Sequence, residues 1–291
     1  MREKSFLEFA SMKTFSKNSV RTSDGVRLNL IEAGQGETLL LLPGWSQSAA
    51  LFRHQLEGLS DRYRVIALDW RGHGDSEKVE AGYRISRLAM DLHDVLMAYD
   101  LESVSVLGHS MGNAVVWCHW DLFGRDRLSH LIIAEQPPTL LSRPSWTSEA
   151  RDRAGCICDA AELQQNCESI EGPGGDEFRA DFVSGMLSSR ISEDERSFII
   201  EENLRMPPNA AATLLFDTSV ADWRDLIPRI DVPTLICAGR GSVVPFASQC
   251  WIRDQIPNAR LEEFAAEEGG SHFMFWEAPE QFNRAVLDFL P

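Results

Sequence analysis

One short run, placed between two segments of different periodicity, constrains this chain more than any other feature. Residues 108–112 read GHSMG, after the β-branched apolar run 103–107 and before residues 113–123, where apolar side chains recur at helical spacing. A serine between a buried strand and a helix, with glycine two positions to either side, is typical of a sharp turn that exposes a nucleophilic hydroxyl. The alternative is a loop serine that caps a helix. In the first case, the free N–H groups at the start of the helix face any oxyanion formed beside Ser110.

Short apolar segments alternate with amphipathic segments along most of the chain. Continuous apolar runs are typical of strands that are buried on both faces of a parallel sheet. Strands are expected at residues 26–31, 38–42, 64–68, 103–107, 129–134, 232–238 and 260–264, most of which are such runs. Helical periodicity is found at residues 84–99 and 277–290. This alternation predicts an α/β protein with a mostly parallel, doubly wound sheet.

The alternation stops between residues 137 and 223. Prolines and glycines there separate several helix-like pieces, among them residues 192–204 and 210–216. We interpret residues 137–223 as a helical cap inserted into a core made of residues 21–136 and 224–291. Residues 1–20 mix charged and apolar side chains without a continuous hydrophobic stretch, so we expect an N-terminal extension and no signal peptide.

Composition narrows the choice of partners. The chain of 291 residues has a formal net charge of -16 and a pI of about 4.9. No basic patch is visible, so neither nucleic acid nor a membrane surface is expected as a partner. The six cysteines have irregular spacing, which favours free thiols over disulfides or a metal site. We therefore expect a cytoplasmic protein that needs no metal or cofactor, and a homodimer stays open.

A histidine near the end of the chain can serve as a general base. His272 follows the last expected strand and precedes the last helix, so it should lie at the same sheet edge as Ser110. The paired glycines shortly before it, Gly269 and Gly270, favour this role over that of a surface-loop histidine. His109 abuts the expected nucleophile and is predicted to pack beneath it.

Several segments together make the chain similar to the α/β-hydrolase superfamily over essentially its whole length. They are the strand that ends in PGW at residues 43–45, the loop DWRGHGDS at residues 69–76, the turn around Ser110 and the late His272. The resemblance implies the α/β-hydrolase fold with an inserted cap and a triad of serine, histidine and acid. It also implies an oxyanion hole formed by the backbone N–H groups of Trp45 and Met111.

The acid is the point at which this chain departs from the usual pattern. Most members of the superfamily place an aspartate after the penultimate strand, where this chain has Ser242. Several members carry the acid one strand earlier, where this chain has Glu135 at the end of an apolar strand. A carboxylate there needs a partner because its desolvation is costly. We therefore assign Glu135 as the partner of His272, with Glu267 and Glu268 as alternatives.

Apolar side chains of the cap are expected to form the substrate pocket. The residues predicted to line it are Trp146, Phe182, Met186, Phe216, Trp223 and, beside the histidine, Phe273. The predicted function is a serine hydrolase that cleaves an ester or lactone of a small apolar organic molecule through an acyl-enzyme. The sequence AEQP around Glu135 also resembles that of fungal-type zearalenone lactonases.

Two alternatives to hydrolysis remain. The segments around Trp45 and residues 69–74 also resemble cofactor-independent quinolone dioxygenases of the same fold, whose histidine–acid pair deprotonates a hydroxy-heterocycle that then reacts with O₂. Those enzymes carry a histidine where this chain has residues 46–48 (SQS), and His-Gly-Gly where this chain has residues 111–113 (MGN). Both departures favour hydrolysis. A non-catalytic receptor that retains the triad is the other alternative, because a fold does not fix a chemistry.

Overall fold

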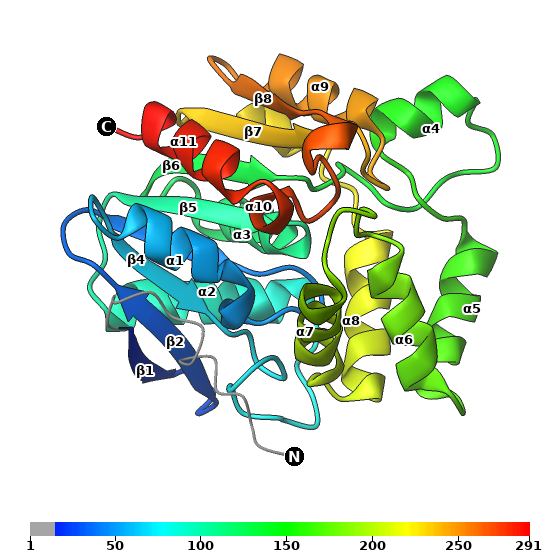
Figure 1. The fold of residues 1–291 in the computed structure, drawn as a ribbon, viewed down its shortest axis with the longest axis horizontal. Coiled ribbons are helices and arrows are strands. Elements are labelled where there is room, and N and C mark those ends of the chain that lie inside the picture. The colour runs from blue at the N-terminus through cyan, green and yellow to red at the C-terminus, as the bar shows by residue number, and fades with distance from the viewer. Residues whose placement is uncertain (1–14) are drawn as a thin grey trace.

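A computed structural model describes residues 15–291, which are built around a sheet with the strand order β1-β2-β4-β3-β5-β6-β7-β8 (Figure 1). The strands β1 and β2 and the strands β2 and β4 pair antiparallel, and every other neighbouring pair is parallel. The predicted mostly parallel sheet is therefore confirmed. The strands are β1 (Ser16–Arg21), β2 (Arg27–Ala33), β3 (Thr38–Leu42), β4 (Arg64–Leu68), β5 (Val104–His109), β6 (Leu128–Ala134), β7 (Thr234–Gly239) and β8 (Arg260–Phe264).

Helices cover both faces of the sheet, because side chains of the central strands alternate between two apolar cores. In β3, Leu40 and Leu42 face the core shared with α2 and α3, whereas Leu39 and Leu41 face the core shared with α1 and α11. The flanking helices are α1 (Arg53–Leu59), α2 (Ile85–Ala98), α3 (Met111–Phe123), α9 (Phe246–Gln255), α10 (Met274–Glu277) and α11 (Pro279–Phe289). Short 3₁₀ helices are η2 (Ala49–Phe52), η3 (Ile227–Arg229) and η4 (Ala266–Glu268).

A helical insertion joins β6 to β7, and α5 to α8 gather at one end of the sheet (Figure 1). Its helices are α4 (Ser148–Ala154), α5 (Ala160–Glu171), α6 (Gly175–Ser184), α7 (Glu193–Leu204) and α8 (Pro208–Val220). Capping boxes start α5 and α7, where Asp159 and Ser192 each accept a backbone N–H while a glutamate three positions on bonds back. The pieces expected at residues 192–204 and 210–216 correspond to α7 and to the middle of α8.

The expected N-terminal extension is wrong for residues 16–20, which belong to β1. Every residue of β1 pairs with β2, yet only Val20 among them is buried. An edge strand held by backbone hydrogen bonds leaves little hydrophobic pattern in the sequence, which explains the error. The rest of the expected extension, residues 1–14, lies outside the described residues. Within the described part, no helix is long and apolar enough to cross a membrane.

Candidate active site

Ser110 stands at the junction of β5 and α3 in a conformation that few residues adopt. Its φ is 50° and its ψ is -127°, which lies outside the regions favoured by non-glycine residues. A β-carbon on Gly108 would collide with the side chain of Asn113, and one on Gly112 would collide with the carbonyl oxygen of Leu42. The turn therefore requires glycine at both positions, as the sequence predicts, and it holds the serine at the start of a helix.

His272 and Glu135 are in direct contact. Nδ1 of His272 lies 2.9 Å from Oε2 of Glu135, and the two side chains are 5% and 0% exposed. Glu135 follows β6 with a φ of 45°, and the backbone N–H of Gly239 donates to its Oε1 at 2.6 Å. The hydroxyl of Ser242 donates to Oε2. Ser242 thus stands where most relatives are expected to have the acid, and it bonds to the acid that this chain has elsewhere.

The alternative acids, Glu267 and Glu268, do not occupy this position. Both lie on the exposed 3₁₀ helix η4. The partner predicted for His272 is therefore the one that the structure brings to it, because β6 and β7 are adjacent and parallel and their carboxyl ends open at the same sheet edge.

His109 links the loop after β3 to the histidine loop. Its Nδ1 lies 2.9 Å from Oε1 of Gln47, which also accepts the N–H of Gly44 at 2.9 Å. Its Nε2 lies 2.8 Å from the carbonyl oxygen of His272. Complete burial, together with the nearby His272, holds the pKa of His109 well below its usual value. His109 therefore packs beneath the serine turn, as predicted, and fixes the backbone on which His272 is carried.

Ser110 and His272 line the same cavity, which has a volume of about 50 Å³. Trp45 and Met111, the two residues expected to supply oxyanion-hole N–H groups, line it as well. Phe182 and Met186 are the predicted pocket residues found in its wall. The complete lining is Trp45, Ser110, Met111, Gln136, Pro137, Leu140, Ile157, Phe182, Met186, Leu215, Thr218, Val243, Val244 and His272.

Four residues predicted to line the pocket are absent from this wall. Trp146 contacts the guanidinium groups of Arg143 and Arg224, whose Cζ atoms are 5.3 and 4.6 Å from its ring centre. Phe216 is 46% exposed, on the side of α8 that faces away from the cavity. Trp146 and Phe216 were therefore assigned wrongly, because helical spacing alone does not tell which face of a cap helix turns toward a site.

The other two errors are aromatic residues that belong to packed cores. The ring centre of Trp223 lies 6.3 Å from that of Trp117, on α3. Phe273 is 1% exposed and packs against His109 and Phe275, with ring centres 5.4 and 5.9 Å apart. Their side chains supply apolar packing behind the site, and neither lies in the cavity wall.

Sequence reasoning missed several wall residues that directly follow sheet strands. Gln136 and Pro137 come after β6, and Val243 and Val244 come shortly after β7. Ligands of open α/β sheets bind beyond the carboxyl ends of the strands. That rule predicts that both loops line the site. It predicts the cavity wall better than the helical spacing of aromatic residues between positions 137 and 223 does.

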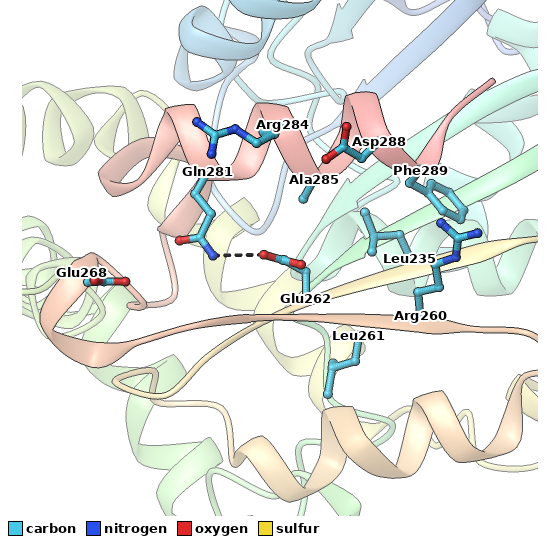
Figure 2. A pocket seen from close by; sticks show the side chains of 10 residues that line it. All are labelled: Leu235, Arg260, Leu261, Glu262, Glu268, Gln281, Arg284, Ala285, Asp288 and Phe289. Atoms are coloured by element: carbon cyan, nitrogen blue, oxygen red, sulfur yellow. Dashed lines mark hydrogen bonds between the residues drawn. The ribbon is translucent and has the colours of Figure 1, made fainter.

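A larger hollow of about 540 Å³ lies elsewhere, between β8 and α11 (Figure 2). Charged side chains of both signs surround it, including Arg260, Glu262 and Arg284, and Gln281 donates to Glu262 at 3.0 Å. Ser110, His272 and Glu135 do not line it, and only Glu268, one of the alternative acids, does. Its greater size therefore does not make it the candidate active site, because it lacks a nucleophile–base pair.

Other reactive groups do not form a second site in the described part of the chain. No group of three or more histidine, cysteine or acidic side chains among residues 15–291 could hold a metal ion. The six cysteines are free thiols, as predicted. Burial raises the pKa of Cys118 and of Cys158 to about 11, so both are expected to be unreactive as nucleophiles at neutral pH.

Comparison with known proteins agrees with this geometry. The family model described as "Alpha/beta hydrolase family" matches residues 39–285. A non-heme chloroperoxidase of Kitasatospora aureofaciens is 28% identical over 280 residues, covering 92% of this chain and 98% of the relative. A bromoperoxidase from Bacillus anthracis superposes with a TM-score of 0.85 at 24% identity, covering 94% of this chain and 99% of that one. An esterase from Exiguobacterium antarcticum gives 0.84 at 23% identity with the same coverage. At these identities the two structures establish a shared fold.

Proposed function

The chain belongs to the alpha/beta hydrolase family, and we propose that it is a serine hydrolase that cleaves an ester or lactone of a small apolar molecule. The contact between His272 and Glu135, at the wall of the cavity that Ser110 also lines, is the observation that carries this proposal. A nucleophile and a base at one cavity, with a carboxylate in contact with the base, are the parts that acyl transfer needs.

The reaction begins when the hydroxyl of Ser110 attacks the acyl carbonyl and its proton passes to Nε2 of His272. Glu135 accepts the Nδ1–H, which fixes the tautomer and stabilises the imidazolium that forms. The N–H groups of Trp45 and Met111 hold the oxyanion. The tetrahedral intermediate then expels the alcohol, which takes the proton from His272. Water activated by His272 attacks the acyl-enzyme, so that the acid leaves and Ser110 regains its proton.

The carboxylate of Glu135 has several hydrogen-bond partners in this buried place. Its carboxylate accepts hydrogen bonds from the N–H of Gly239, the hydroxyl of Ser242 and the ring of His272. Hydrogen bonds to a charged group are stronger than those between neutral groups, and they compensate for lost hydration. The loop after β7 thus supports an acid that the preceding strand supplies.

We assign the helical insertion, residues 137–223, the role of a cap. The cavity of about 50 Å³ is well below the roughly 300–1,000 Å³ of ordinary ligand pockets. Phe182 of α6 and Leu215 of α8 form part of its wall. Because the cavity is too small for such a ligand, substrate entry requires these cap helices to shift. Ile157 and Val243 line the cavity and are 40% and 42% exposed, which marks them as its apolar mouth.

Labelling and turnover test the proposed function together. A fluorophosphonate probe should modify Ser110, located by mass spectrometry, and 4-nitrophenyl butyrate or an apolar lactone should be hydrolysed. Ser110→Ala should abolish both results. Ser105→Ala, on the same strand but outside the cavity wall, is the matched control and should retain them. Label on a different residue, or turnover that survives Ser110→Ala, would contradict the proposal.

One assay separates this proposal from the dioxygenase alternative. Oxygen uptake with a hydroxyquinolone, retained in Ser110→Ala and lost in His272→Ala, would replace hydrolysis by proton abstraction as the function of the His272–Glu135 pair.

A further inference from the structure

Two polar side chains in the wall of the cavity lack hydrogen-bond partners among residues 15–291. They are Nε2 of Gln136 and Oγ1 of Thr218. Both residues are buried, with exposures of 1% and 3%. Most of the remaining wall is apolar. Buried polar groups normally have hydrogen-bond partners, so these two unpartnered groups need an explanation.

Thr218 differs in this respect from a threonine on the same helix. Thr213, on the exposed side of α8, donates its hydroxyl to the carbonyl oxygen of Asn209 at 2.8 Å, one turn back. That bond is the usual internal solution for a helical threonine. Thr218 is on the cavity side of the helix and makes no such bond. Its buried hydroxyl therefore lacks the internal partner that the hydroxyl of Thr213 has.

Gln136 is held by its backbone while its side-chain amide nitrogen stays unpaired. Its carbonyl oxygen accepts from Nε2 of Gln249 at 3.2 Å. It directly follows Glu135, so its position beside the reacting groups is fixed by the end of β6. An unpartnered N–H and an unpartnered O–H in a mostly apolar wall can each donate to a carbonyl, ether or hydroxyl oxygen.

We propose that the substrate carries a second acceptor oxygen, separate from the scissile carbonyl, which binds Gln136 Nε2 and Thr218 Oγ1. This inference rests on the proposed hydrolysis. The substrate class is then an oxygenated ester or lactone, such as one with an oxo group on its acyl portion, and not a plain hydrocarbon acyl ester. Sites with buried donors reject analogues that lack the matching acceptor, because the donors are then left unpaired.

The first experiment compares 4-nitrophenyl esters of hexanoic, 4-oxohexanoic and 5-oxohexanoic acid. The wild-type protein should favour one oxo ester over hexanoate by at least about tenfold in kcat/KM. Thr218→Val and Gln136→Met should each reduce that preference by at least about fivefold. Thr213→Val, the same substitution on the exposed side of α8, should leave the preference unchanged. Equal kcat/KM values for all three esters would overturn the inference.

The second experiment measures binding without chemistry. Calorimetric titration of Ser110→Ala with methyl hexanoate and the two methyl oxohexanoates should give at least about tenfold tighter binding of one oxo ester, and Thr218→Val should remove the difference. Equal affinities would overturn the inference. Hydrolysis of all esters without preference would leave the proposed function standing. Selective binding without any hydrolysis would support the inference and contradict the proposed function.

Discussion

Oε2 of Glu135 receives both the ring of His272, at 2.9 Å, and the hydroxyl of Ser242. Position 135, after β6, and position 242, after β7, therefore both lie where an acidic side chain could reach His272. The geometry follows from the sheet, since β6 and β7 are parallel neighbours and release their following residues at one edge. The earlier strand thus supplies the carboxyl group, and the later strand supplies a hydroxyl that donates to it.

We predict that Glu135→Gln lowers kcat/KM for an ester by about 10³- to 10⁴-fold, because an amide in this place favours the wrong imidazole tautomer. Ser242→Ala removes one of three donors to the carboxylate and should cost about tenfold or less. Steady-state kinetics on both variants, with circular dichroism to confirm folding, measures the difference. Equal and mild losses would mean that Glu135 is not the acid.

The acid should also be movable to the later strand. Ser242→Asp alone places a second carboxylate against Glu135, so we expect lower activity and a lower melting temperature from like-charge repulsion. The double variant Glu135→Gln/Ser242→Asp keeps one negative charge beside His272. It should recover at least about tenfold of the activity lost in Glu135→Gln. Glu135→Gln/Ser242→Asn, which restores no charge, is the control and should recover nothing.

The loop after β3 is hydrogen-bonded to two helices of the insertion between β6 and β7. Ser46 has a φ of 57° and donates its buried hydroxyl to Oδ1 of Asn203 on α7 at 2.7 Å. Arg179, which is 1% exposed, donates in turn to the backbone carbonyl of Asn203 at 2.6 Å. Trp45 donates its indole N–H to the carbonyl oxygen of Ala211 on α8 at 2.8 Å. The backbone around the expected oxyanion donor is therefore tied to two cap helices.

We predict that Asn203→Leu lowers kcat by about tenfold or more while KM changes less than threefold, since a displaced Trp45 N–H weakens binding of the transition state more than of the substrate. Affinity for a trifluoromethyl ketone, which forms an oxyanion in the site, should fall in parallel with kcat. Asn209→Leu, at an exposed position near the start of α8, is the control. A pure rise in KM would place Asn203 in substrate binding instead.

Some site residues could be predicted from the sequence because chemistry or backbone sterics require a particular residue type at their positions. The turn at Ser110 needs Gly108 and Gly112 on steric grounds, and Glu135 interrupts an apolar strand. His272 stood out through its position after the last strand. The buried central strands were also predictable from the sequence, because both of their faces are apolar.

The wall of the cavity was less predictable because it depends on the rotation of helices around their own axes. On α8, Leu215 lines the cavity whereas the larger Phe216, one residue later, is 46% exposed. Consecutive helical residues differ in direction by about 100°, so a small change in helix orientation decides which one faces a ligand. Such rotations are set by tertiary packing, which residue spacing alone does not reveal.

Two buried histidines outside the active site should make stability depend on pH. Burial lowers the pKa of His73 and of His119 to about 4. Nε2 of His73 and both ring nitrogens of His119 lack hydrogen-bond partners among residues 15–291, so no bonded carboxylate offsets the charge of a protonated ring. Both remain neutral in the folded protein at a pH where the unfolded chain, with an ordinary histidine pKa near 6.5, binds protons.

The unfolded state therefore gains protons first, and stability is lost as pH falls below about 6.5 toward 4. At pH 5 each histidine should reduce the free energy of unfolding by about 2 kcal/mol relative to pH 7.5. Urea unfolding followed between pH 7.5 and 5, above the range of most carboxyl groups, measures the slope. His119→Phe, which keeps an aromatic ring beside Phe123, should flatten the slope by close to one proton. An unchanged slope in that variant would show that the pKa of His119 is not lowered in the folded protein.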